Sequence, residues 1–220
     1  MIEATGVSLR YPDDTLALES FDLQIETGEM VYVTGPSGSG KTSLLKLLLG
    51  TEYPTTGSLK VMEQPITKGQ TAKIRRLRRI IGPVFQEFRL LKGRTAMENV
   101  ILGMRFLDLT KACLMENASK ALVRVGLEHK AFSPVENLSL GEQQRVAIAR
   151  AVARQPVMIL ADEPTGNLDK DNALNILELL ASFQDKNTSV IITTHATHLI
   201  NSAKEIKLIT MDKGRMRWER

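Results

Sequence analysis

Residues 30–50 constrain the fold most, because they join an apolar strand, a glycine-rich loop and a leucine-rich helix. The strand is MVYVT (Met30–Thr34), the loop is GPSGSGKT at 35–42, and the helix continues with SLLKLLLG. A short apolar run that ends in a turn is typical of a buried parallel strand. The strand–loop–helix order therefore predicts the first unit of an α/β core.

The loop at 35–42 carries the residues that a polyphosphate site needs. Gly35, Gly38 and Gly40 let the backbone curl with its N–H groups inward, and the following helix adds the positive end of its dipole. Lys41 supplies a charge for the β- and γ-phosphates, and the Thr42 hydroxyl is placed to bind Mg²⁺. The candidate nucleotide-binding residues of this loop are Gly35, Pro36, Ser37, Gly38, Ser39, Gly40, Lys41, Thr42 and Ser43.

A second segment supplies two adjacent carboxylates. Val157–Ala161 is predicted to be a buried parallel strand, because the run is short and apolar and follows Pro156. It ends at Asp162 and Glu163, at the edge where open α/β sheets bind ligands. Asp162 suits a Mg²⁺ contact, direct or through water, and Glu163 can polarise an attacking water. The two segments together predict a site for nucleotide hydrolysis.

Composition limits the other classes of protein. The formal net charge of +4 is a mild excess that does not argue for nucleic-acid binding. The single cysteine, Cys113, cannot form an internal disulfide, which fits a reducing cytoplasm. No apolar run approaches the roughly 18 residues of a membrane span. Glu3 interrupts the N-terminus, so no signal peptide is expected, and any membrane role is expected to need another polypeptide.

One local basic cluster stands out at residues 73–79. Its charged members are Lys73, Arg75, Arg76, Arg78 and Arg79. We favour a solvated amphipathic helix whose apolar members turn inward, namely Ile74, Leu77 and Ile80–Ile81. The alternative is a surface that faces anionic lipid or an acidic loop of a partner.

Hydrophobic periodicity predicts the remaining elements. Strands at 2–9, 18–25 and 58–62 are expected to form an antiparallel sheet. Helices are expected at 97–109, 111–125 and 142–154, with Gly126 as a C-cap. Beyond Asp169, helices and strands should alternate, which favours a parallel sheet. The expected ranges there are helix 170–183, strand 188–193, helix 197–203, strand 205–210 and strand 214–218.

The stretch LSLGEQ at 138–143 completes a resemblance to the ATP-binding cassette (ABC) ATPases, which covers nearly all 220 residues. It resembles the family's signature motif, whose serine and glycine contact the γ-phosphate held by the opposite subunit. Ser139 and Gly141 match, and Glu142 is a frequent variant. Leu140 stands where the family usually has glycine, which has more freedom at positive φ. Ser139 is expected at a helix N-terminus, where donors are free for an anion.

Smaller motifs follow in family order. The resemblance implies that Tyr11 stacks on adenine, that Gln86 senses Mg²⁺ and the attacking water, and that His195 contacts the γ-phosphate. His198 is the competing candidate for the last role. The D-loop of the family, which crosses to the partner subunit, matches Asn167, Leu168 and Asp169. The implied catalytic residues are Glu163, His195 and Gln86, and the implied metal ligands are Thr42, Gln86 and Asp162.

The resemblance also implies a fold. It is an α/β fold with a P-loop NTPase core, an antiparallel β-subdomain and an α-helical subdomain. Residues 1–220 are expected to form a single ATP-binding domain. Within it, 1–94 and 156–220 would form the core with the antiparallel sheet, and 95–155 the helical subdomain.

The implied assembly is a homodimer that closes on ATP and Mg²⁺, with a half-site on each subunit. An integral membrane partner is expected to dock on the helical subdomain, and this places the chain in the cytoplasm at the inner face of the membrane. The apolar anchors for that partner are Phe85, Phe88, Leu90 and Leu91.

Within the family, IGPVFQEFRLL and ENVILG look most like the bacterial cell-division branch. The ATPases of that branch pair with a membrane protein and signal to cell-wall hydrolases. Two alternatives stay open: the ATPase of a lipoprotein-release or macrolide-type exporter, and an ATP-binding scaffold that no longer hydrolyses. The domain anatomy disfavours a soluble family member that acts in DNA repair or translation.

Overall fold

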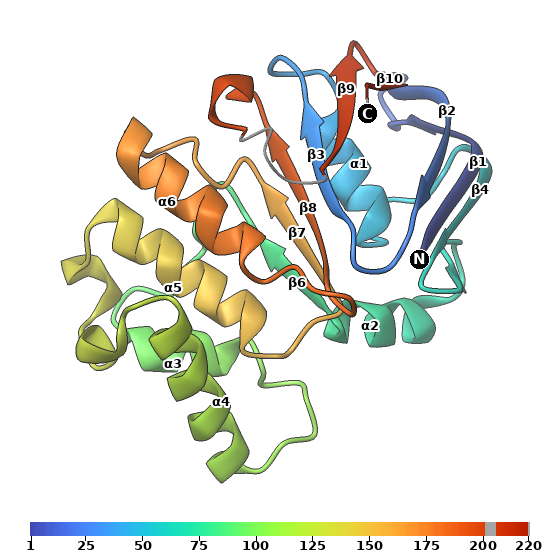
Figure 1. Cartoon of the computed structure of the whole chain (residues 1–220). Coiled ribbons are helices and arrows are strands. Elements are labelled where there is room, and N and C mark those ends of the chain that lie inside the picture. Colours follow the sequence, from blue (N-terminus) through green and yellow to red (C-terminus); the bar gives the residue numbers. More distant parts are fainter. Residues whose placement is uncertain (201–205, 220) are drawn as a thin grey trace. The chain divides into compact units, whose positions relative to one another are not determined.

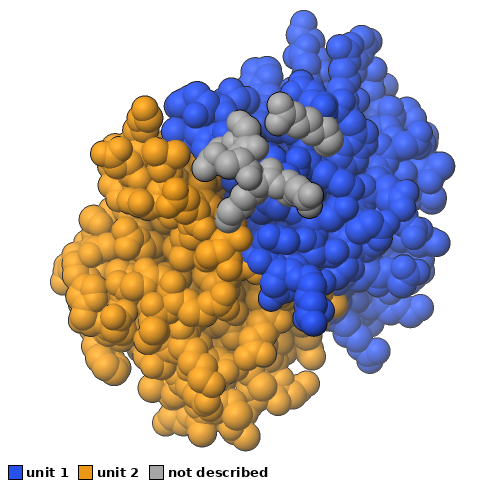
Figure 2. Space-filling model, viewed as in Figure 1, with its two compact units in different colours: residues 1–78, 184–220 blue, residues 79–183 orange. Residues whose placement is uncertain are grey.

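The computed structural model describes residues 1–200 and 206–219, in two compact units (Figure 2). Unit 1 combines Met1–Arg78 with Gln184–Arg220, and unit 2 is Arg79–Phe183. The subdomain boundaries that the sequence suggests, 1–94 with 156–220 and 95–155, stay a prediction.

The first sheet of unit 1 is antiparallel, as predicted, with strand order β2-β1-β4-β5 (Figure 1). Apolar and polar residues alternate along its long strands, so that one face is buried; Ile2, Val7 and Leu9 are at most 2% exposed. Its strands are β1 (Ile2–Arg10), β2 (Leu16–Ile25), β4 (Thr56–Val61) and β5 (Gln64–Pro65).

The second sheet of unit 1 contains the strand that leads into the glycine-rich loop. β3 pairs in parallel with β8 on one side and β9 on the other, and β10 pairs antiparallel with β9. Every residue of β3 and β8 is buried, which explains their continuous apolar character. The elements are β3 (Met30–Thr34), α1 (Lys41–Leu48), α2 (Thr71–Arg79), β8 (Ser189–Thr194), η3 (Thr197–Leu199), β9 (Lys207–Asp212) and β10 (Arg215–Trp218).

Unit 2 pairs two parallel strands, β6 and β7, and adds four α-helices within the described residues (Figure 1). Helices α3, α4 and α5 pack on one another, and α5 also contacts β6 and α6. The elements are β6 (Ile81–Val84), α3 (Ala96–Leu102), α4 (Lys111–Arg124), η1 (Glu128–Lys130), η2 (Val135–Asn137), α5 (Leu140–Val152), β7 (Met158–Asp162) and α6 (Lys170–Ala181).

Two sequence-based predictions about helices are wrong. The helix expected at 97–109 ends at Leu102, because Gly103 caps it and a series of turns leads to α4. In the basic cluster, α2 does bury Ile74 and Leu77, whereas Ile80 is 42% exposed, since the helix has already ended at Arg79. Of the helix expected at 197–203, residues 197–199 form η3, and 201–203 lie outside the described residues.

Candidate nucleotide site

The glycine-rich loop lies between β3 and α1 in unit 1, as predicted. Gly40 is the N-cap of α1 with φ 104°, a left-handed conformation that favours glycine. A Cβ on Gly40 would lie 2.7 Å from the carbonyl oxygen of Ala17, and one on Gly35 would lie 2.1 Å from that of Met211. The loop is therefore shaped by close backbone approach to β2 and β9, which no larger residue would allow.

Lys41 lies inside the curl of this loop. Its side chain is buried, and Nζ donates hydrogen bonds to the carbonyl oxygens of Gly35 at 2.7 Å and Pro36 at 3.0 Å. Thr42 is exposed at the start of α1. This places an ammonium group within the backbone turn that the sequence assigns to phosphate.

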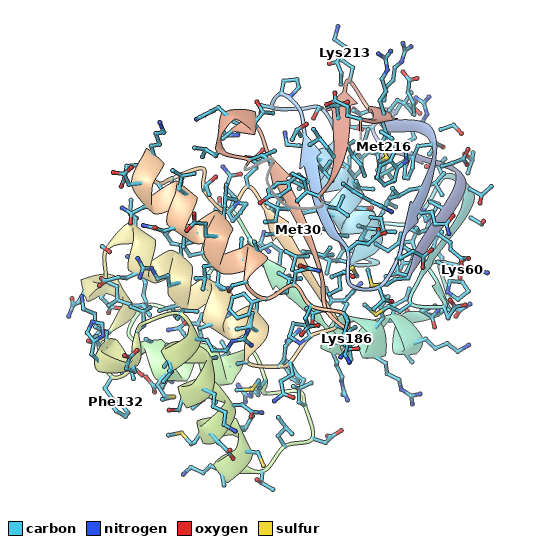
Figure 3. The ribbon with its side chains drawn as sticks, viewed as in Figure 1. Met30, Lys60, Phe132, Lys186, Lys213 and Met216 are labelled. Carbon is cyan, nitrogen blue, oxygen red and sulfur yellow. The ribbon has the colours of Figure 1, made fainter. Side chains whose placement is uncertain are left out.

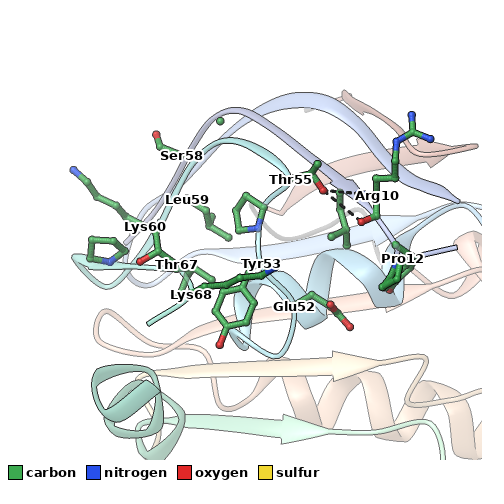
Figure 4. A pocket seen from close by; sticks show the side chains of 16 residues that line it. Arg10, Pro12, Glu52, Tyr53, Thr55, Ser58, Leu59, Lys60, Thr67 and Lys68 are labelled. Atoms are coloured by element: carbon green, nitrogen blue, oxygen red, sulfur yellow. Dashed lines mark hydrogen bonds between the residues drawn. The ribbon is translucent and has the colours of Figure 1, made fainter. Parts of the chain in front are cut away.

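Tyr11 follows β1 directly and contacts α1, the helix after the loop. Its hydroxyl forms a 3.0 Å hydrogen bond with the hydroxyl of Ser43, and Nζ of Lys46 lies 5.6 Å from the ring centroid. Tyr11 also lines a hollow of about 660 Å³ in unit 1, together with Pro12, Tyr53 and Thr55 (Figure 4). No residue of the loop at 35–42 lines this hollow, so the stacking role of Tyr11 stays a prediction.

His195 follows β8 directly, so it starts from the same sheet edge as the loop. Thr34 pairs with Thr194, which puts Gly35 and His195 at the carboxyl ends of adjacent parallel strands. His195 is exposed. His198, the competing candidate, is also exposed but lies in η3, farther from the strand end.

In unit 2 the carboxylates and Gln86 share another strand edge. Val84 pairs with Ala161 in the parallel ladder of β6 and β7, so Gln86 and Asp162–Glu163 follow at the same end. Glu163 has φ 44°, a conformation that side chains other than glycine rarely adopt. Such strain persists only where the surrounding structure holds it, and it clusters at functional sites. Asp162, which ends β7, is half-buried.

The D-loop contacts Gln86 directly, and it reaches the signature through Asn172 of α6. Asn167 donates a long hydrogen bond of 3.5 Å to the carbonyl oxygen of Gln86. Asp169 caps α6, and its carboxylate accepts from the backbone and side-chain nitrogens of Asn172 at 3.0 and 2.6 Å. Backbone N–H donation from Asn172 is the main reason why the pKa of Asp169 is lowered. A Cβ on Gly141 would lie 3.3 Å from Asn172 Oδ1, while Leu168 is half-buried.

Ser139 is the N-cap of α5, as predicted for the signature. Its hydroxyl accepts from the backbone N–H of Glu142 at 3.3 Å, and the Glu142 carboxylate accepts from the backbone N–H of Ser139 at 2.9 Å, a complete capping box. Lys130 adds an ion pair with Glu142 at 2.5 Å. These donors, Lys130 first, lower the pKa of Glu142. Nearby, Phe132 is exposed on the surface of unit 2 (Figure 3).

The expected strain at Leu140 is absent. The sequence suggested that a leucine here lacks the positive φ open to glycine. Leu140 is instead the first residue of α5 and is not among the residues with positive φ. Its side chain is 53% exposed. The backbone N–H groups at the start of α5 are therefore kept with a leucine at this position.

The segment that carries the expected docking residues is only partly exposed. Phe85, Phe88 and Leu90 are half-buried, and Leu91 is 49% exposed. Two polar side chains that no motif spacing singled out, the buried Asn99 and the half-buried Arg150, bond to the backbone of this segment. The only sequence signal for them was a polar residue within an otherwise apolar helical pattern.

Comparison with known proteins agrees with this geometry. The family model of the ABC transporter matches residues 18–166. The cell division ATP-binding protein FtsE of Mycobacterium tuberculosis is 38% identical over 98% of this chain and 94% of its own length. FtsE of Escherichia coli K12 is also 38% identical, over 98% of this chain and 97% of its own. Both the resemblance to ABC ATPases and the resemblance to the cell-division branch are confirmed.

A solved structure agrees on the fold. It is the dimeric structure of an ATP-binding cassette in a post-hydrolysis state, bound to ADP and Pi. Its TM-score is 0.86 at 31% identity, and the alignment covers 100% of this chain and 99% of that one. The predicted α/β fold with a P-loop NTPase core is thereby confirmed. Among the described residues, no helix is both long and apolar enough to cross a membrane.

Proposed function

Since this chain belongs to the ABC transporter family, whose cassettes bind and hydrolyse ATP, we propose that it is the ATPase subunit of a membrane complex in bacterial cell division. The observation that carries the cell-division role is the near full-length similarity to proteins named FtsE. The chain itself is an ATPase, and the two strand edges that end in Gly35 with His195 and in Gln86 with Glu163 supply its candidate residues.

The roles of the site residues follow from their chemistry. Lys41 and the N–H groups of the loop bind the triphosphate, and Tyr11 stacks on the base. Glu163 orients and polarises the attacking water, while His195 donates to the γ-phosphate as charge develops there. Each of these contacts supports in-line transfer of the phosphoryl group to water.

The oxygen donors of the site fit Mg²⁺. Thr42 offers a hydroxyl, Gln86 an amide oxygen and Asp162 a carboxylate, and Mg²⁺ prefers one or two such ligands with the remainder from phosphate and water. We assign these three residues to the metal. When bound, Mg²⁺ would neutralise charge on the phosphate oxygens.

The signature is proposed to act on the nucleotide of a second copy. Ser139, Gly141 and the start of α5 present a hydroxyl and backbone N–H groups at an exposed helix N-terminus, which suits a γ-phosphate. ATP would then join two copies face to face, with residues 167–169 crossing at the interface. Hydrolysis would release them, which gives a two-state element for a partner to sense.

The partner is proposed to be an integral membrane protein like FtsX. It would dock on the half-buried apolar side chains of the segment 85–91, and the ATPase would lie in the cytoplasm at the inner face of the membrane. Docking there would couple ATP-driven closure to activation of cell-wall hydrolases. The anchors for this contact are Phe85, Phe88, Leu90 and Leu91.

Two variants test the ATPase assignment. Lys41→Ala should abolish ATP binding, because Lys41 meets the phosphates before reaction. Glu163→Gln should bind ATP normally and hydrolyse it about 10²- to 10³-fold more slowly, because the carboxylate acts on the water. Nucleotide affinity and phosphate release are measured for both. Wild-type turnover by Glu163→Gln would refute the assignment.

A further inference from the structure

The segment 85–91 joins β6 to α3, and side chains of two helices hold its backbone. Arg150 of α5 donates from Nη1 to the carbonyl oxygen of Arg89 at 2.5 Å and from Nη2 to that of Phe88 at 2.7 Å. Asn99 of α3 accepts from the N–H of Leu91 at 2.7 Å and donates to its carbonyl oxygen at 3.1 Å. Hydrogen bonds to Phe88, Arg89 and Leu91 thus fix the end of the segment.

Arg150 makes these bonds at an electrostatic cost. Burial lowers the pKa of its guanidinium, and the neighbouring charges of Arg154 and Arg89 lower it further. A rigid guanidinium fork can bond two successive carbonyls at once, which the single ammonium of a lysine does not reproduce. The position therefore requires arginine geometry as well as positive charge.

One bond from Arg150 goes to Arg89, the residue of the segment that has a positive φ. Arg89 has φ 50°, and its guanidinium carbon lies 4.0 Å from the centroid of the Phe85 ring. A side chain other than glycine keeps such a backbone only where the surroundings hold it. The carbonyl bonds from Arg150 supply that restraint.

Gly103 lies close against Arg150. A Cβ on Gly103 would lie 2.7 Å from Arg150 Cγ and 2.6 Å from the carbonyl oxygen of Arg150. Two residues beyond the end of α5, Arg154 donates to the carbonyl oxygens of Ile81 and Gly103, so its bonds hold the start of β6 and the residue that caps α3. Arg150 and Arg154 therefore hold different parts of unit 2.

We propose that Arg150 is a positioning residue for hydrolysis, one that makes the segment 85–91 and the signature helix move as one body. Ser139 caps the other end of α5, about 16 Å from Arg150 at 1.5 Å per residue. Displacement of Phe88 and Arg89 by a docked partner would therefore be passed to Ser139, and closure at Ser139 would be passed to Gln86. This inference rests on the proposed roles of Gln86 and Ser139.

Arg150→Lys tests the inference, with Arg154→Lys, just beyond the end of the same helix, as the matched control. Both variants keep the positive charge and lose a half-buried guanidinium that bonds two carbonyl oxygens, so both should lower the melting temperature by a similar amount. Hydrogen exchange of the amides at 86–91 should become about tenfold faster only in Arg150→Lys. kcat for ATP should fall about tenfold only in that variant, at unchanged KM, because the loop at 35–42 is untouched.

Gly103→Ala provides a second route to the same result. Its φ of −58° suits alanine, so the substitution acts through the close approach of Cβ to the carbonyl oxygen and Cγ of Arg150, and it should reproduce the faster exchange at 86–91. Because the Gly103 carbonyl also accepts from Arg154, this variant supports the comparison of the two arginines and does not replace it. Equal exchange and equal kcat in Arg150→Lys and Arg154→Lys would overturn the inference. Absence of ATPase activity in the wild-type chain would refute only the proposed function. The hydrogen-exchange comparison of the two variants would still decide whether Arg150 holds the segment 85–91.

Discussion

The loop at 35–42 in unit 1 and the signature at the start of α5 in unit 2 present backbone N–H groups in two different ways. The loop is shaped by backbone atoms that approach glycines closely, as at Gly35 and Gly40. The signature is shaped by side-chain hydrogen bonds, the capping box of Ser139 and Glu142 with Lys130 behind it. The loop should therefore tolerate no added atom at these positions, whereas the signature should lose function in steps as each bond is removed.

The strongest test of this difference compares two glycines of the loop. Gly35→Ala would place a methyl group 2.1 Å from a carbonyl oxygen, so we expect a loss of about 2–3 kcal/mol of stability and of measurable ATP binding. Gly38→Ala meets nothing within 4 Å, so only the left-handed φ of 77° is costly, about 1–2 kcal/mol. Thermal unfolding and nucleotide titration measure both. Similar losses in the two variants would mean that close approach does not shape the loop.

A smaller effect is expected at the signature, where side-chain hydrogen bonds hold the backbone. Ser139→Ala and Thr95→Ala each remove the N-cap of a complete capping box in unit 2, so each should cost about 1 kcal/mol of stability. Only Ser139→Ala should also lower kcat, by about five- to tenfold, the worth of one hydrogen bond of about 1 kcal/mol. Steady-state ATPase assays separate the two effects. An equal fall in kcat for Thr95→Ala would remove the catalytic role of the signature serine.

The smallest expected effect is a pH dependence at the same capping box. Because the folded pKa of Glu142 is below its usual 4.5, its contribution to stability is present above that pH and is lost as pH falls through the folded pKa. Glutamine still completes a capping box, so Glu142→Gln removes the titration and the ion pair to Lys130. The melting temperature of the wild type should exceed that of Glu142→Gln at pH 7, and the gap should close below pH 4.5. A gap that stays constant down to pH 3 would contradict this.

The two regions also differ in what the sequence could predict. The strand Met30–Thr34, the loop and the helix after it were predictable because their determinants are adjacent in the chain. Ser139 as an N-cap was predictable for the same reason. The C-terminal end of α3 was not, because the helix stops where Gly103 packs against Arg150, 47 positions away in the chain.

The restraint on the segment 85–91 was unpredictable on similar grounds. Arg150 bonds to carbonyl oxygens about 60 residues earlier, and Asn99 bonds to the backbone of Leu91 from within an apolar helix. Neither contact leaves a local pattern of residue types. Motif spacing predicted Gln86 as a site residue. Only the folded structure shows which side chains hold the segment 85–91 that contains it.

The account depends most on ATP joining two copies through the loop of one and the signature of the other. Light scattering of Glu163→Gln with and without ATP and Mg²⁺ tests this most directly, because slow hydrolysis should preserve the closed state. The account predicts the mass of one 24.4 kDa chain without nucleotide and twice that mass with ATP. A chain that remains monomeric at saturating ATP would contradict it.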